Sequence, residues 1–126
     1  MSILLADDDN DLRTLITDEL SNAGYDVSPV VDGVEAVVMA AEQHFDLFLL
    51  DMLMPRMDGL STIRVLNKLA PRTPIIAFTG YIGKGYMSQA ALLGVICLSK
   101  PVTVEVLLKE VELALKGHSN RTNPSF

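Results

Sequence analysis

Five short apolar runs, separated by amphipathic segments, place the strongest constraint on how this chain can fold. The runs are residues 3–6, 27–31, 47–50, 75–78 and 95–98. Uninterrupted apolar runs of this length are typical of strands that are covered on both faces. The run 27–31 is interrupted by Ser28 and Pro29, so we expect this strand at the edge of a sheet, where a proline is tolerated.

The segments between the runs carry apolar residues at helical spacing. Gly24 and Pro71 end the first and third of these stripes, and Asp32 and Thr103 are candidate N-cap residues for the second and fifth. A fourth, short helix is predicted over 86–93. Five strands that alternate with five helices predict an α/β domain, in which a parallel sheet has helices on both faces.

Length and composition limit the classes of protein to which this chain can belong. A chain of 126 residues fits one domain, predicted over 1–116, followed by a polar tail, 117–126, that is expected to be flexible. The formal net charge of -6 argues against direct binding to nucleic acid, which needs clustered basic residues. No apolar run approaches the ~20 residues that cross a membrane. The single cysteine, Cys97, is typical of a protein in a reducing cytoplasm.

The polar residues that follow four of the runs are candidates for a functional site. They are Asp7, Asp8 and Asp9 after the first run, Asp51 after the third, Thr79 after the fourth, and Lys100–Pro101 after the fifth. Right-handed crossovers bring the carboxyl ends of parallel strands to one edge of the sheet, which is where ligands bind in such folds. Carboxylates that meet there repel one another and require a cation. An open site of oxygen ligands suits Mg²⁺.

The same residues indicate a reaction. An ionised aspartate can act as a nucleophile and form an aspartyl phosphate. A metal ion, the Lys100 ammonium group and the Thr79 hydroxyl group would stabilise the charge on the transferred phosphoryl oxygens. The sequence therefore predicts Mg²⁺-dependent phosphoryl transfer to a carboxylate.

Four segments, "ILLADDDNDLR", "FDLFLLDMLMPRMDGL", "IIAFT" and "CLSKP", resemble in order and spacing the four signatures of response regulator receiver domains. The resemblance covers residues 3–115. It implies a flavodoxin-like, doubly wound α/β fold with a five-stranded parallel sheet of order 2-1-3-4-5 and five helices. It also implies that a histidine kinase or a phosphotransfer protein donates the phosphoryl group.

The resemblance assigns a role to each matching residue. Asp51 would be the phosphoacceptor, Lys100 would bind a phosphoryl oxygen, and Thr79 would move toward it after phosphorylation. Mg²⁺ would be held by Asp8 directly, by Asp7 through water, by Asp51, and by the backbone carbonyl of Leu53. The Lys100–Pro101 peptide bond is expected to be cis, and Asp9 is expected to cap the first helix.

Two departures from the family pattern concern how phosphorylation is sensed within the domain and how long the phosphoryl group persists. Cys97 stands where the family usually has Tyr or Phe, so the usual aromatic switch is absent or altered; Tyr81 or Tyr86 is a candidate replacement. Leu53 and Tyr81 flank the path of a hydrolytic water, and Leu53 has no polar side-chain group to orient it. We therefore expect slow loss of the phosphoryl group.

The output of the domain is open to several interpretations. The family's usual dimer surface, made by the fourth helix, fifth strand and fifth helix, is a candidate homodimer interface, and the downstream protein target is unknown. The chain is either a single-domain regulator or the receiver segment of a larger regulator or hybrid kinase. A phosphorylation-independent interaction module is an alternative. A small Mg²⁺-dependent phosphatase is disfavoured, because Leu53 stands where that chemistry needs a second carboxylate.

Overall fold

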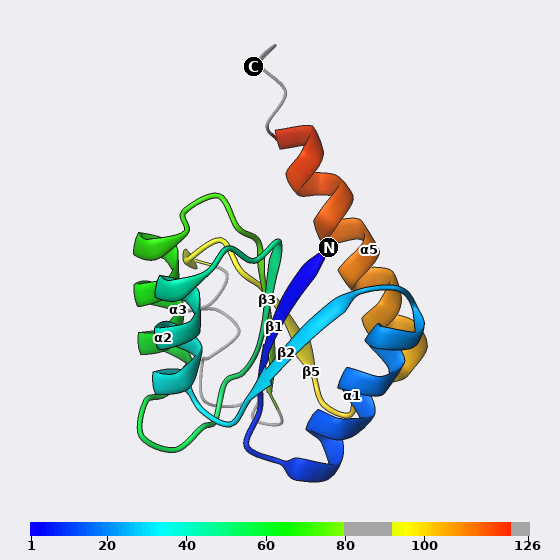
Figure 1. Ribbon diagram of the computed structural model, residues 1–126, viewed down its shortest axis with the longest axis horizontal. Helices are drawn as coiled ribbons and strands as arrows, with labels where there is room; N and C mark the ends of the chain where they lie inside the picture. Colours follow the sequence, from blue (N-terminus) through cyan, green and yellow to red (C-terminus); the bar gives the residue numbers. More distant parts are fainter. Residues whose placement is uncertain (80–91, 122–126) are drawn as a thin grey trace.

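The computed structural model describes residues 1–79 and 92–121, and in these residues the chain forms a sheet with helices on both faces (Figure 1). The strands are β1 (Ser2–Ala6), β2 (Asp26–Val30), β3 (Leu47–Asp51), β4 (Ile75–Thr79) and β5 (Ile96–Ser99). The helices are α1 (Asn10–Asn22), α2 (Gly33–Glu42), α3 (Gly59–Leu69) and α5 (Val104–Arg121). Most of the predicted fourth helix, 86–93, lies outside the described residues, so four helices are described rather than the five expected.

The sheet has the predicted topology. Its order is β2-β1-β3-β4-β5, and every neighbouring pair is parallel. β2 is an edge strand, as its interrupted apolar run predicts, and Pro29 pairs in register with Leu5 of β1. Helices α2 and α3 cover one face of the sheet, and α1 and α5 cover the other (Figure 1). The order and the two-sided cover confirm a doubly wound α/β fold.

Alternation along the central strands divides the core into two layers. Leu4 and Ala6 of β1 belong to the layer that also contains residues of α2 and α3, and Ile3 and Leu5 belong to the layer with α1 and α5. β3 and β4 are buried along their whole length. Each fully buried aliphatic side chain contributes about 1.5–3 kcal/mol relative to exposure, so both layers hold the three central strands in register.

Short polar contacts fix where the helices begin and end. The Asp9 carboxylate accepts hydrogen bonds from the amides of Asp11 and Leu12 at 3.0 and 3.1 Å, which confirms its capping role. The Thr103 hydroxyl likewise accepts from the Val106 amide at 3.2 Å. Gly24, just beyond α1, has a φ of 97°, a left-handed conformation that favours glycine.

The C-terminal end of α5 differs from the sequence-based boundary. A flexible tail was expected from Gly117, whereas α5 continues to Arg121. A single glycine is tolerated inside a helix at a modest cost, so Gly117 does not end this one. Residues 122–126 lie outside the described part of the chain, and the flexibility of the tail stays a prediction. None of the helices described has both the length and the apolar character of a membrane span.

A pair of glycine substitutions tests the packing at the start of α3. A Cβ atom at Gly59 would lie 2.6 Å from the Met52 Cα atom and 2.8 Å from its carbonyl oxygen, whereas nothing lies within 4 Å of the same position at Gly117. We expect Gly59→Ala to lower the free energy of unfolding by about 1–3 kcal/mol through overpacking. Gly117→Ala should raise it by about 0.5–1 kcal/mol. Urea denaturation of both variants measures these changes, and equal effects would contradict the packing described here.

Candidate functional site

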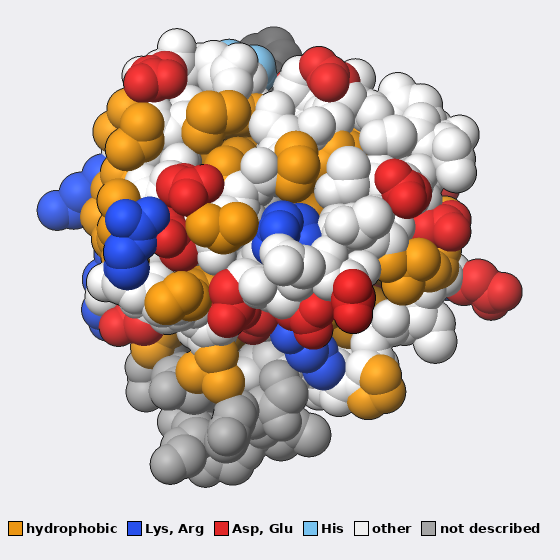
Figure 2. All heavy atoms as spheres, turned by 60° about the horizontal axis from the view of Figure 1, so that its bottom comes forward, with side chains coloured by type: hydrophobic (Ala, Val, Ile, Leu, Met, Phe, Trp, Pro, Cys, Tyr) orange, Lys and Arg blue, Asp and Glu red, His pale blue; other side chains and the backbone are white. Residues whose placement is uncertain are grey.

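Three carboxylates meet at the carboxyl-terminal edge of the sheet, the face that comes forward in Figure 2. Asp7, Asp8 and Asp51 each offer one oxygen atom, and these atoms lie within 4.8 Å of one another. The sheet dictates this meeting, because β1 and β3 are neighbours with Ala6 opposite Leu50. The next residue of each strand, Asp7 and Asp51, therefore projects from the same edge. Asp7 and Asp51 are buried, and Asp8 is exposed.

Asp51 has a polar partner at each oxygen. Its Oδ2 atom lies 3.0 Å from Lys100 Nζ, and its Oδ1 atom accepts a hydrogen bond from the Leu53 amide at 3.1 Å. The Lys100 ammonium group also lies 5.6 Å from the centroid of the Phe78 ring. The Lys100 amide donates to the Thr79 carbonyl oxygen at 2.8 Å. The Asp51 side chain is thus held by the Leu53 amide, which lies just after β3, and by Lys100, which lies in the segment after β5.

Asp7 is a buried carboxyl group under electrostatic strain. Its Oδ1 atom accepts a hydrogen bond from the Asp9 amide at 2.9 Å, while its buried Oδ2 atom has no hydrogen-bond partner among the described residues. Burial raises the pKa of Asp7 to about 6, and the charge of Asp51 adds to the rise, against the lowering effect of the Asp9 amide. A buried carboxylate oxygen without a partner, between two further carboxylates, fits a hard divalent cation such as Mg²⁺.

The other predicted residues lie as follows. Thr79 is fully buried at the end of β4, and the Lys100–Pro101 peptide bond is cis, as expected. The Leu53 side chain is partly exposed beside Asp51. Cys97 is half-buried on β5, where it packs against the core layer next to α2 and α3, and burial raises the pKa of its thiol. Tyr81 and Tyr86 lie outside the described residues.

Arg13 was missed by the sequence analysis. Its Nη1 atom donates a hydrogen bond to the Asp7 carbonyl oxygen at 2.7 Å, and its guanidinium group also contacts the Asn10 side chain. Arg13 lies four residues after the N-cap Asp9 and its amide donates to the Asp9 carbonyl. The signal that could have identified Arg13 is its position: it is a basic residue one turn into the helix that follows the acidic end of a strand.

The geometry supports one kind of chemistry. A nucleophilic carboxylate, an ammonium group that contacts it, and two further carboxylates that can hold a divalent cation lie together at one edge of the sheet. An incoming phosphoryl group would meet positive charge on two sides of Asp51, from Lys100 and from a bound cation. Phosphoryl transfer to Asp51 is the reaction that uses all of these groups.

Comparisons with known proteins point to one family of domains. A family model described as the response regulator receiver domain matches residues 3–112. The sensor protein EvgS of Escherichia coli strain K12 is 37% identical over 108 residues, which are 85% of this chain and 9% of EvgS. The response regulator receiver protein CpdR of Brucella abortus strain 2308 is 35% identical over 114 residues, 90% of this chain and 95% of CpdR. This chain therefore spans a small part of the first relative and nearly all of the second.

Solved structures give the same result. The receiver domain protein (CheY-like) of Methanospirillum hungatei JF-1 matches with a TM-score of 0.92 and 26% identity, over 95% of this chain and 97% of that one. The chemotaxis protein CheY4 of Vibrio cholerae matches with a TM-score of 0.82 and 28% identity, over 90% of this chain and 97% of that one. The fold of this chain is thus the fold of these proteins.

The raised pKa of Asp7 predicts how stability depends on pH in metal-free buffer. The carboxyl group ionises near 3.8 in an ordinary environment and near 6 in the folded protein. The folded state therefore binds this proton more tightly, and the resulting stability is present at low pH and is lost as the pH rises through about 6. A difference of about two pKa units corresponds to at most about 3 kcal/mol.

We expect Asp7→Asn to remove this loss of stability at high pH, because the asparagine amide stays neutral at every pH. In the presence of a chelator, the variant should be more stable than the wild type above pH 6, and the difference should shrink toward pH 4. Urea denaturation from pH 4 to pH 8 measures it, with Asp18→Asn, which changes an exposed carboxylate on α1, as the control. A wild-type advantage over Asp7→Asn at pH 8 would contradict the raised pKa.

Proposed function

The chain belongs to the response regulator receiver domain family, and from this we propose that it accepts a phosphoryl group on Asp51 in a Mg²⁺-dependent reaction. The donor is a histidine kinase or a phosphotransfer protein, and the domain signals by changed protein contacts. The observation that carries the proposal is the position of Asp51, with its Oδ2 atom 3.0 Å from Lys100 Nζ and one oxygen within 4.8 Å of oxygens of Asp7 and Asp8.

The residues of the site would have separate roles in the phosphoryl transfer. An ionised Asp51 oxygen attacks phosphorus, and an O–P bond forms as the P–N bond to the donor histidine breaks and its electron pair returns to the imidazole nitrogen. Asp8, Asp7 through water, Asp51 and the Leu53 carbonyl would hold Mg²⁺. When bound, the ion offsets the negative charge of the phosphoryl oxygens. Lys100, which contacts Asp51 before the reaction, would then contact a phosphoryl oxygen.

The signal would leave the site through Thr79. Its buried position at the end of β4 supports a role in which its hydroxyl group moves toward the phosphoryl oxygen. Cys97 is too small to act as the usual aromatic switch, so we propose that Tyr81 or Tyr86 takes over that role. A homodimer through β5, α5 and the segment before them is a candidate output. Ile96 of β5 and Leu113 of α5 expose 43% and 52% of their surface, which supports an apolar contact.

The relatives favour two settings for this domain, which we propose to act in the cytoplasm. EvgS and RcsC of Escherichia coli are sensor proteins of which this chain spans 9% and 12%, which supports a receiver segment of a larger protein. The match over 95% of CpdR supports a receiver that acts alone. The replacement of the usual aromatic by Cys97 favours a second candidate function, a protein-interaction module that works without phosphorylation.

Phosphorylation with acetyl phosphate and Mg²⁺ tests the proposed function. We expect a mass increase of one phosphoryl group in the wild type and in Asp18→Asn, and none in Asp51→Asn or after chelation of the metal. Lys100→Ala should slow the reaction, because the charge on the phosphoryl oxygens loses a partner. An unmodified wild-type protein would favour the interaction module, and steady turnover of a phosphomonoester would instead favour a phosphatase.

The lifetime of the phosphoryl group tests the role of the Leu53 side chain. That side chain is 38% exposed next to Asp51 and has no polar group to orient an attacking water. We expect Leu53→Asn to hydrolyse the aspartyl phosphate several-fold faster than the wild type, and Tyr81→Ala to do so as well. The decay of the phosphorylated form after removal of acetyl phosphate gives both rates. Leu53→Met is the matched control, and an equal rate in Leu53→Asn would refute this role.

A further inference from the structure

We propose that Arg56 is a positioning residue for the phosphoacceptor site, because its ion pair with Asp32 holds the loop that carries Leu53. The loop, residues 52–58, joins β3 to α3 and will be called the β3–α3 loop. This inference rests on the proposed function, because it concerns how the chain prepares the site for Mg²⁺. It adds a residue that touches neither the ion nor Asp51.

The β3–α3 loop is fastened to the sheet at its start, and its two ends are joined to each other. The Met52 amide donates to the Phe78 carbonyl oxygen at 3.0 Å, and the Gly59 amide donates to the Met52 carbonyl oxygen at 3.1 Å. Leu53 then turns its amide toward Asp51 Oδ1 at 3.1 Å. Asp58 is held as the N-cap of α3, where its Oδ1 atom accepts from the Ser61 amide at 2.7 Å. The part of the loop that requires a separate anchor is therefore residues 54–57.

Arg56 provides that anchor. Its Nε atom donates to Asp32 Oδ2 at 2.7 Å, its Nη2 atom lies 2.5 Å from the same oxygen, and Nη2 lies 3.8 Å from Glu35 Oε2. Among the described residues, these are the ion pairs that join the loop to another element. Arg56 also has a φ of 67°, a left-handed conformation that costs a non-glycine residue on the order of 1 kcal/mol. The ion pair offsets this cost in the folded protein.

Asp32 is a rigid partner for Arg56. It is 3% exposed, and its Oδ1 atom caps α2 by accepting from the Glu35 amide at 2.9 Å. Burial alone would raise its pKa, but the Glu35 amide and the Arg56 guanidinium group together lower the pKa of Asp32, which keeps it ionised. A buried, ionised and doubly hydrogen-bonded carboxylate has little freedom, so it offers a fixed partner to the Arg56 side chain, which is 57% exposed.

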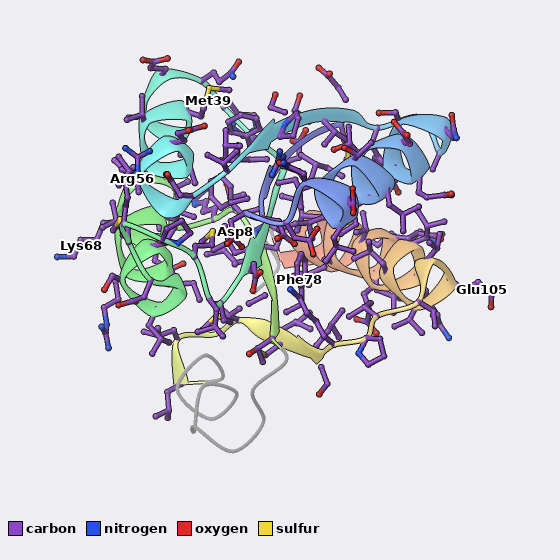
Figure 3. All side chains as sticks on the ribbon, turned by 90° about the horizontal axis from the view of Figure 1, so that it is seen from below. Asp8, Met39, Arg56, Lys68, Phe78 and Glu105 are labelled. Carbon is purple, nitrogen blue, oxygen red and sulfur yellow. The ribbon has the colours of Figure 1, made fainter. Side chains whose placement is uncertain are left out.

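The ion pair connects the two sides of the metal site. Asp32 follows β2 closely, and the carbonyl oxygen of Val30 in that strand accepts from the Asp7 amide at 3.2 Å. The start of α2 also abuts the loop, since a Cβ atom at Gly33 would lie 2.9 Å from the Met57 carbonyl oxygen. Figure 3 looks onto this edge of the sheet. Asp8 is labelled near its centre, and Arg56 lies to one side, beside α2. Asp7 and Leu53 are therefore positioned against each other through Asp32 and Arg56.

The direction in which the Mg²⁺ affinity changes distinguishes a positioning role of Arg56 from a simple effect of its charge. Removal of a positive charge near a cation site strengthens cation binding through long-range electrostatics. Loss of a positioning contact weakens it, and outer contacts of a metal site cost roughly tenfold in affinity at the low end. We therefore expect Arg56→Met to bind Mg²⁺ about tenfold more weakly than the wild type, although it is the more negative protein.

Isothermal titration with Mg²⁺ makes this measurement on the full chain. Arg64→Met is the matched control, because it removes the same charge from an exposed side chain on α3 and should bind Mg²⁺ as the wild type does or slightly more tightly. Asp32→Asn keeps a good N-cap residue and weakens the ion pair, so it should also bind Mg²⁺ more weakly. The double variant Arg56→Met/Asp32→Asn should lose no more affinity than the larger single change.

Amide exchange in metal-free protein gives a second readout. The amide of Leu53 should exchange faster in Arg56→Met than in the wild type and Arg64→Met. Unchanged or tighter Mg²⁺ binding by Arg56→Met, or an unchanged Leu53 exchange rate, would overturn the positioning role. If the wild type itself does not bind Mg²⁺, the proposed function fails, and the exchange rate of Leu53 still decides whether Arg56 holds the loop.

Discussion

The mutual repulsion of Asp7, Asp8 and Asp51 is the constraint on which the rest of the site depends. Two of these carboxylates are buried, and one ammonium group, that of Lys100, contacts Asp51. Charges this close in an environment that partly excludes water interact strongly. They stay together in the folded protein because the register of the strands fixes where they leave the sheet. The strain appears at Asp7, whose raised pKa records the cost of ionisation there. A divalent cation would be attracted by all three carboxylates and would relieve their mutual repulsion. The free energy gained in this way would contribute to the affinity of the site for the metal.

The sheet can impose this arrangement because its central strands have no freedom to move apart. β1, β3 and β4 are covered on both faces, and their register fixes which residues leave the sheet side by side. The acidic edge is therefore supported by two hydrophobic layers at once. The loops at this edge add only local adjustments, such as the turn of the Leu53 amide toward Asp51.

Much of this arrangement could be predicted from the sequence, because it depends on local patterns. Apolar runs and helical spacing identify the described strands and helices, and Asp9 and Thr103 cap helices where their side chains predict. The meeting of Asp7, Asp8 and Asp51 follows from parallel topology. The pairing of Arg56 with Asp32, 24 residues away in the chain, could not be predicted, since no periodicity relates the two. The continuation of α5 to Arg121 was also not expected, because the polar residues from 117 onward are typical of a flexible tail.

Pro29 in the outer strand has a consequence for the behaviour of the protein at high concentration. A strand at the rim of a sheet offers unpaired amide and carbonyl groups to other chains, and this is a common route to aggregation. Pro29 has no amide hydrogen, and it stands in the middle of β2. The β2 rim is therefore a poor template for strand addition. Association of two copies at this rim would therefore rely on side-chain contacts and not on strand pairing.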